Sequence, residues 1–240
     1  MWQLKNNYNH MKVLVLIILQ LGLFLSAYAQ EASMLVFRVG LGNYNMKSQK
    51  LFQQDFLQGS EIPYRKVHEF PNFPTFGGAA SFRIAPKASL GLWFELASTG
   101  GRLHYKDYSG HALMDQVLTS FQGGPFVQYR LNKSEEWPLY ITAHGFAATV
   151  TQKIRSEFQI VGPPETEEIT LKATNLGIRP GFMLGHALGM FNFQLGFGAE
   201  IRSIDTLEDK EKRFFRTSDG KNLTAEWNGW RMTLGVGIAL

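Results

Sequence analysis

The sequence predicts an all-β protein: a transmembrane antiparallel up-and-down β-barrel of about eight strands, following an N-terminal signal peptide. Three observations lead to this fold class. The last stretch, Glu226 to Leu240, alternates apolar and polar residues to the final position. Similar alternating segments recur from Ser33 onward. The segments that connect them are alternately long and short, as in barrels with short turns at one end and long loops at the other.

The final segment has a strand period of two. One face carries only apolar residues, and the other carries Arg231, Thr233 and small residues: the apolar set is Trp230, Met232, Leu234, Val236, Ile238 and Leu240. A bare apolar strand at a chain end needs a partner, because unpaired ends fray. A closed barrel supplies one, since its last strand pairs with its first. This segment therefore predicts barrel closure.

Residues 1–29 are interpreted as a secretory signal peptide. Lys5 and Lys12 precede an apolar run from Val13 to Leu25, and the small residues of Ala27-Tyr28-Ala29 place the expected cleavage before Gln30. The alternative is an uncleaved anchor helix, but the run is short for a span of about 20 residues. Residues 30–240 are then expected to form one barrel domain.

The expected strands follow in order along the mature chain. They cover residues 34–42, 76–84, 89–99, 125–131, 138–150, 174–185, 190–201 and 230–240. The first connection, from Asn43 to about Phe76, contains a stretch at residues 46–58 that can form a short helix with Leu51, Phe52 and Phe56 on one side. The other long connections are expected at residues 100–111, 160–168 and 205–222. Tight turns are expected at residues 85–88, 132–137 and 186–189.

Composition removes several classes of function. The chain has no cysteine, which excludes disulfides, thiolate metal sites and a lipidated N-terminal cysteine. The net charge is +4, and two of these charges lie in the expected signal peptide. Such a balance gives no support for nucleic-acid binding.

Two barrels fit the alternation, and they differ in which face points inward. A soluble lipocalin-like barrel turns its apolar face toward a ligand, whereas a membrane barrel turns it toward lipid. The polar face here carries isolated charges among many glycines, which suits the narrow interior of an eight-stranded barrel. The membrane form is therefore favoured, with aromatic girdles expected from Tyr105, Tyr108, Tyr129, Trp137, Trp227 and Trp230.

The charges on the polar face predict a lumen network. Charges away from water are tolerated when they are paired, so the arginines are expected to share two carboxylates, with neutral polar groups and water taking the remaining donors. The predicted network consists of Arg38, Arg83, Glu95, Arg130, Arg179, Glu200 and Arg231. Such an interior would be a plug rather than a channel.

The mature chain resembles the small outer-membrane β-barrel proteins of Gram-negative bacteria, the group with OmpA-transmembrane-domain or OmpX-like architecture. The resemblance rests on the strand pattern from Ser33 to Leu240 and on a C-terminal signal in which Thr233, Gly235 and Ile238 are spaced as in that group, with Leu240 in place of the usual aromatic residue. It implies a monomeric barrel in the outer membrane, in contact with outer-membrane lipid, folded by the barrel assembly machinery, and serving as scaffold, adhesin, binding surface or accessory subunit. No cofactor is implied.

One stretch offers candidates for catalysis. His104, Asp107, Ser109 and His111 lie close together in a connection, where a membrane-embedded acyl hydrolase would place a serine, a histidine and an acid. An exposed polar loop is the simpler interpretation. His144 is interpreted as a hydrogen-bonding lumen residue, because no partner stands at metal-ligand spacing. We therefore expect no catalytic, cofactor-binding or metal-binding residues.

Three classes of function remain: a non-enzymatic surface or accessory barrel, a lipid-modifying barrel enzyme and a narrow pore. A pore needs a lumen free of long side chains, which the arginines and Trp93 oppose. The sequence thus favours a non-enzymatic surface-exposed binding or structural barrel. Its partner would be another envelope protein or a surface ligand, met through the first connection (Asn43 to Pro74) and the last (Asp205 to Asn222).

Overall fold

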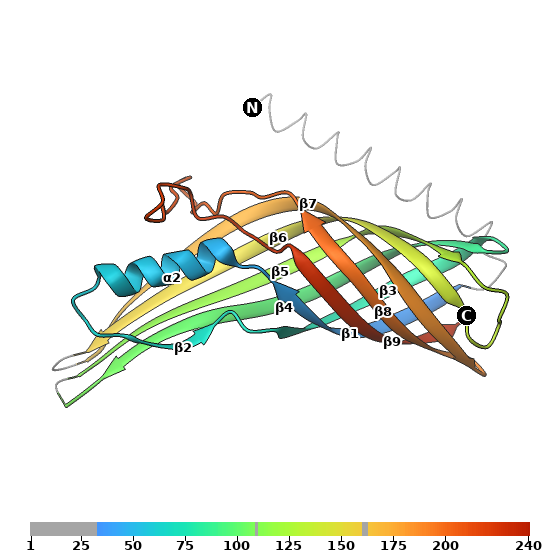
Figure 1. Cartoon of the computed structure of the whole chain (residues 1–240), viewed down its shortest axis with the longest axis horizontal. Helices are drawn as coiled ribbons and strands as arrows, with labels where there is room; N and C mark the ends of the chain where they lie inside the picture. Colours follow the sequence, from blue (N-terminus) through green and yellow to red (C-terminus); the bar gives the residue numbers. More distant parts are fainter. Residues whose placement is uncertain (1–32, 109, 160–162) are drawn as a thin grey trace, which may run out of the picture.

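The chain forms a closed ring of antiparallel strands in the computed structural model, which describes residues 33–108, 110–159 and 163–240 (Figure 1). The predicted signal peptide lies outside the described residues. The strands are β1 (Met34–Tyr44), β2 (Arg65–Glu69), β3 (Phe73–Ala85), β4 (Ala88–Lys106), β5 (His111–Arg130), β6 (Leu139–Gln159), β7 (Glu165–Leu188), β8 (Phe191–Arg202) and β9 (Gly229–Ala239). The pairing order β4-β3-β1-β9-β8-β7-β6-β5, closed by β4 with β5, makes an eight-stranded barrel, and β2 adds to the outer part of β4. The predicted fold class is confirmed.

Closure joins the first strand to the last. Leu35 lies opposite Ile238 and Val39 opposite Leu234, so the alternation of the two strands is in register. Inside the barrel, the predicted glycines make room for inward-pointing rings. A Cβ atom at Gly177 would lie 2.4 Å from the ring of Phe146, so a larger residue there would displace that ring.

Two predicted connections are wrong in part, because strands extend into them. The stretch 100–111 continues β4 to Lys106 and begins β5 at His111. The stretch 160–168 contains the start of β7 at Glu165. Polar residues in these stretches suggested loops. In residues 102–106, however, polar and apolar residues alternate, and a strand outside a membrane needs only one apolar face. Residues 165–168 are all polar, and they are strand because they pair with β6.

The outer face of the barrel is apolar over the part that spans a membrane. Large apolar side chains point outward from all eight strands and remain exposed, among them Phe37, Leu92, Leu176, Phe197 and Leu234. The strands β1 and β9 have 11 residues each, close to the length needed to cross a bilayer. Among the described residues, no helix is long and apolar enough to cross a membrane.

The end of the apolar band is marked by a change in side-chain chemistry along β4 and β5. The opposed pair Leu96 and Phe121 is apolar and exposed. One step farther out on the same face, Ser98 opposes Thr119. The next pair is Gly100 with the exposed Val117, and beyond it Arg102 opposes Asp115. The membrane boundary therefore lies between the Leu96–Phe121 pair and the Arg102–Asp115 pair.

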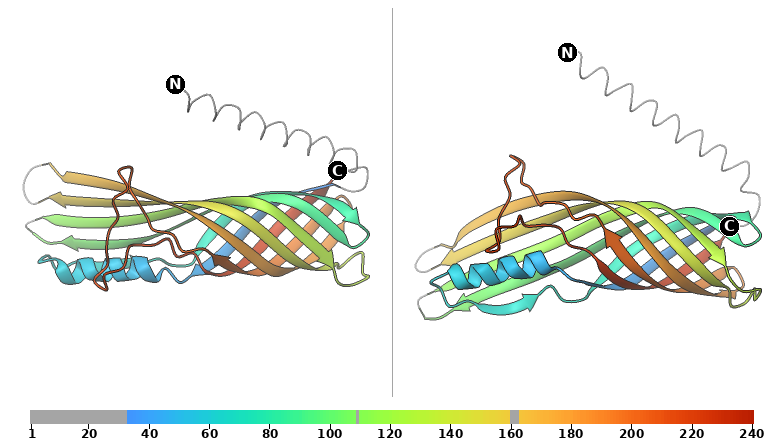
Figure 2. Two further views of the ribbon diagram at one scale, coloured as in Figure 1. Left: turned by 90° about the horizontal axis from the view of Figure 1, so that it is seen from above. Right: turned by 45° about the horizontal axis from the view of Figure 1, so that its top comes forward.

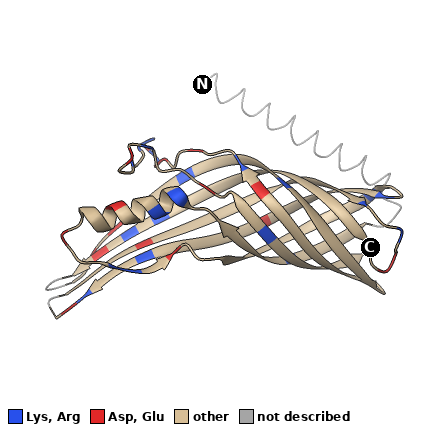
Figure 3. Cartoon of the chain, viewed as in Figure 1, with Lys and Arg blue, Asp and Glu red and all other residues tan. Residues whose placement is uncertain are grey.

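Beyond this boundary, four strands continue and form a separate structure, which we call the tip. It consists of the outer parts of β4, β5, β6 and β7 with β2, covered by helix α2 (Lys47–Gly59) and the segment 203–228 (Figure 2). The predicted helix at residues 46–58 is confirmed. Charged residues gather on the tip, and further charges lie on the strands of the barrel (Figure 3).

The tip has its own hydrophobic core. The fully buried side chains include Leu103, Leu118, Leu171, Leu207 and Trp227. Trp227 was expected in an aromatic girdle, but it is buried between Tyr44, with ring centroids 4.9 Å apart, and Phe73, at 5.5 Å. Tyr105 and Tyr108 lie at the far end of the tip rather than at the membrane boundary. The tip is therefore a packed body, not a set of loops.

The orientation of the apolar face gives a direct prediction. Leu234 lies in the middle of β9 and is 55 % exposed, so Leu234→Arg should lower the free energy of unfolding by about 2–4 kcal/mol if lipid covers it. Urea unfolding in vesicles measures this. Ile204→Arg is the control, because Ile204 is 61 % exposed but follows β8 outside the apolar band, and a change there should stay within about 0.5 kcal/mol. Equal costs at the two positions would contradict a lipid-facing surface.

Candidate functional site

The lumen is crossed by a network of buried charges whose centre is Glu200. This carboxylate accepts hydrogen bonds from Arg179, with Nη2 at 2.6 Å, and from Arg202, with Nε at 2.6 Å. The Nε atom of Arg231 lies 2.7 Å from its Oε2. Glu200 comes from β8, Arg179 from β7 and Arg231 from β9, so the network joins three neighbouring strands.

Glu95 extends the network to the opposite wall. Its carboxylate, on β4, pairs with Arg179 at 3.3 Å and with Arg231, and it accepts a hydrogen bond of 2.8 Å from Gln122. Since Arg179 contacts both carboxylates, it bridges the barrel from β7 to β4. Its guanidinium also lies 4.5 Å from the centre of the Trp93 ring. These groups fill the lumen at this level.

The other predicted arginines lie apart from the two carboxylates. Arg83 and Arg130 share the inward face of β3 and β5 but lie near the end of the short turns, and in the described part of the chain neither makes an ion pair with Glu95 or Glu200. Arg38 projects into the lumen, where its Nη2 donates to Gln194 at 3.4 Å. The prediction that all five arginines share the two carboxylates therefore needs correction. Of the five, Arg179 and Arg231 do so. Strand position separates Arg83 and Arg130 from the carboxylates, and Arg38 donates to Gln194 instead.

One member of the network was missed. Arg202 is buried and donates to Ser120 at 3.0 Å and to Gln122 at 2.6 Å, in addition to Glu200. The expected strand ended at Ile201, so Arg202 was not assigned a face. The alternation itself contained the information, because Arg202 is two positions from Glu200 and so points to the same side.

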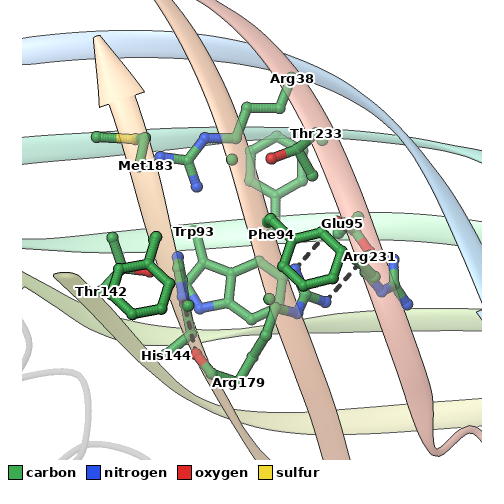
Figure 4. Close-up of a pocket in the computed structure, with 16 residues that line it drawn as sticks. Arg38, Trp93, Phe94, Glu95, Thr142, His144, Arg179, Met183, Arg231 and Thr233 are labelled. Carbon is green, nitrogen blue, oxygen red and sulfur yellow. Dashed lines mark hydrogen bonds and ion pairs between the residues drawn. The ribbon is translucent and has the colours of Figure 1, made fainter. Parts of the chain in front are cut away.

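A cavity of about 40 Å³ lies beside this network (Figure 4). Its lining includes Arg38, Trp93, His144, Arg179 and Arg231. His144 is buried, with its ring stacked on Phe126 at 5.2 Å and its Nδ1 3.4 Å from the carbonyl oxygen of Arg179. This placement agrees with a hydrogen-bonding lumen role for the histidine.

In the tip, the two longest connections are joined to each other. The Glu226 carboxylate accepts a hydrogen bond of 3.0 Å from the backbone N–H of Lys47, at the start of α2. A negative group at this position is favourable, because the first N–H groups of a helix lack partners within the helix. The side chain of Gln49 donates to the carbonyl of Thr224, and the N–H of Ser218 donates to Asp55 at 2.7 Å. The helix and the segment 203–228 thus form one cover over the tip.

The outward face of the tip carries a row of alternating charges. Arg102, Asp115, Arg155 and Glu168 stand directly opposite one another on β4, β5, β6 and β7. Arg102 and Asp115 form a two-pronged ion pair with distances of 2.5 and 2.8 Å. Arg155 forms its ion pair with Glu157 of its own strand, and Glu168 pairs with Lys153 of β6. Opposite charges across strands thus favour the pairing of β4 with β5 and of β6 with β7.

The stretch from His104 to His111 lies at the far end of the tip. His111 does not pair with the acid of its own stretch: its Nε2 lies 3.0 Å from Glu157, on β6. Asp107 instead accepts hydrogen bonds from the hydroxyl of Tyr105 at 2.6 Å and from the N–H of Gly110 at 3.1 Å. The hydrogen bond from His111, assisted by Arg155, lowers the pKa of the Glu157 carboxyl. Ser109 lies outside the described residues.

No group of three or more acidic or histidine side chains suited to a metal ion occurs within residues 33–108, 110–159 and 163–240.

No protein-family model and no curated protein sequence matches the chain. Among solved structures, it is similar to Ail, the attachment invasion locus protein of Yersinia pestis, with 14 % identity over 88 % of this chain and 100 % of that one, at a TM-score of 0.38. It is also similar to the outer membrane protease OmpT of Escherichia coli, with 10 % identity over 88 % and 97 %, at a TM-score of 0.35. Neisserial surface protein A shares 8 % identity over 86 % and 96 %, at a TM-score of 0.33. The assignment of the fold rests on the ring of eight paired strands and on the exposed apolar face of this chain itself.

Proposed function

We propose that this protein is a non-enzymatic outer-membrane barrel that presents a rigid binding or structural surface outside the membrane. The observation that carries the proposal is the tip. Four strands leave the apolar band and enclose a core of their own, under a cover made from the two longest connections. A chain whose only task was to cross the membrane would need neither the added strand length nor the added core.

The side chains that fill the lumen favour a plug rather than a pore. Arg179, Arg202, Arg231, Glu95 and Glu200 are buried at one level. The packed core of the tip lies beyond them. We expect the purified protein in planar bilayers to show no conductance above the leak of the bilayer. Stable single-channel steps at neutral pH would contradict a closed lumen.

The partner is proposed to be another envelope protein or a surface ligand that meets the tip. Photo-crosslinking amino acids placed at Tyr108 and Lys106, which are exposed at its far end, test this in intact cells. The expected result is a discrete crosslinked species from these positions. Lys87, exposed in the short turn between β3 and β4, is the matched control and should not give the same species. Crosslinking only at Lys87 would show that the binding surface lies at the short-turn end of the barrel and not on the tip.

A lipid-modifying enzyme is the competing proposal, and His111 is the residue that separates the two. If the protein is not an enzyme, His111→Ala should cost only the partly buried contact with Glu157 and leave the behaviour of the envelope unchanged. Phospholipid and lipopolysaccharide acyl chains from cells that express either form are compared by mass spectrometry. A product present with the parent and absent with a normally folded His111→Ala variant would replace the binding proposal with an enzymatic one.

A further inference from the structure

The interior of the barrel contains more positive charge than the network neutralises. Six arginines lie on inward-facing positions of the strands, against the two carboxylates Glu95 and Glu200. The six are Arg38, Arg83, Arg130, Arg179, Arg202 and Arg231. A charge inside a protein is costly unless an opposite charge and hydrogen bonds accompany it. The lumen therefore has a strong preference for anions.

Among these arginines, Arg38 is the one on the lumen cavity that lacks a carboxylate partner in the described structure. It has no carboxylate within ion-pair distance among the described residues. Its contacts there are the 3.4 Å hydrogen bond to Gln194 and the ring of Phe126, 5.5 Å from its guanidinium carbon. A guanidinium has five N–H donors. Most of those of Arg38 have no partner within the described part of the chain, and the side chain lines the lumen cavity.

A second donor on the same cavity also lacks an acceptor. The indole N–H of Trp93 is buried and makes no hydrogen bond in the described structure, although Trp93 is only 4 % exposed. Buried N–H groups nearly always have an acceptor. The cavity thus brings together a cation without an ion-pair partner and a neutral donor without an acceptor. The Glu95 carboxylate also lines it, but Arg179 and Arg231 neutralise that charge (Figure 4).

His144 also lines the cavity, but it needs a hydrogen-bond donor rather than an acceptor. If its Nδ1–H donates to the carbonyl of Arg179, its neutral Nε2 is an acceptor, and that atom is buried without a partner. An anion cannot satisfy it, but a water molecule can. A volume of about 40 Å³ is sufficient for a small ion with a water beside it.

We propose that the cavity between Arg38 and Trp93 binds a monovalent halide-sized anion, chloride under ordinary conditions, together with a water that donates to His144. Arg83 and Arg130 lie toward the short-turn end, where their charge attracts anions into the lumen. The anion neutralises part of the charge excess that Glu95 and Glu200 leave, so it is a structural component of the plug.

The test uses the full-length mature protein in neutral detergent. Thermal unfolding is measured as chloride replaces gluconate at constant ionic strength, because gluconate is too large for the cavity. A saturable rise in Tm with chloride is expected, and crystals grown in bromide should show an anomalous peak between Arg38 and Trp93. An identical Tm in both salts with no peak in the cavity would overturn the proposal.

Variants separate this site from a general salt effect. Arg38→Gln and Trp93→Phe should each weaken the apparent affinity for chloride, the former about tenfold or more because a hydrogen bond from a charged group is lost. Arg83→Gln is the matched control, since it removes the same charge at the mouth of the barrel and should keep saturation. If Arg38→Gln does not fold, Trp93→Phe and the bromide peak decide the question. An equal loss in Arg83→Gln would show that only the total charge of the lumen matters, and would reject the site.

Discussion

Glu200→Gln should lower the free energy of unfolding by about 3–5 kcal/mol, because removal of one partner from a buried ion pair leaves an uncompensated charge. Glu200 contacts three arginines, and it is fully buried together with Arg231. After the change, Arg202 retains only the neutral partners Ser120 and Gln122. Urea unfolding in detergent, followed by tryptophan fluorescence, measures the loss.

Two comparisons make this prediction specific. Asp115→Asn removes a carboxylate from the exposed ion pair with Arg102 and should cost no more than about 1 kcal/mol. The double change Glu200→Gln with Arg202→Gln should recover part of the lost free energy of unfolding, because it also removes one of the arginine charges that Glu200 had neutralised. If Glu200→Gln costs no more than Asp115→Asn, Glu200 is not the centre of the network.

Trp227→Ala should cost a similar amount, about 3–5 kcal/mol, as expected for truncation of a large buried aromatic side chain. Trp227 is fully buried, packs on Tyr44 and Phe73, and lies under the guanidinium of Arg202 at 5.3 Å. It therefore connects the core of the tip to the lumen network. The loss should appear mainly as opening of the tip, with faster proteolysis within residues 203–228 while the barrel remains resistant.

Trp137→Ala is the control for this change. Trp137 lies near the short turns, is 48 % exposed and stacks on His186 at 4.1 Å. Its truncation should leave the proteolysis of residues 203–228 unchanged. If the two variants are cleaved equally fast there, the core around Trp227 does not hold the cover in place.

The barrel was predictable from the sequence, because its pattern is local. In β8 and β9, residues that alternate along the chain also alternate between lipid and lumen, and their pairing follows from that alternation. The inward positions of Glu95, Arg179 and Arg231 follow from the same rule. Arg202 was not predicted to face the lumen because the predicted strand 190–201 stops one residue before it.

The tip was not predictable in the same way. Its core combines Leu103 of β4, Leu171 of β7 and Leu207 and Trp227 of the last connection, which are far apart in the sequence. No local pattern marks Trp227 as buried, since its partners Tyr44 and Phe73 come from the opposite end of the chain. The separation of Arg83 and Arg130 from the two carboxylates likewise depends on strand stagger, which alternation does not specify.

The contacts between α2 and the segment 203–228 also set an order of assembly. Glu226 meets Lys47, and Thr224 meets Gln49, across sequence separations of 179 and 175 residues. Contacts of such long range form slowly, because the intervening chain must first be closed into a loop. The helix can therefore reach its final position only after the segment 203–228 has arrived at the tip. Closure of the barrel has the same requirement, because β1 pairs with β9 across still longer separations. The cover of the tip and the ring of strands therefore both depend on the two ends of the chain meeting.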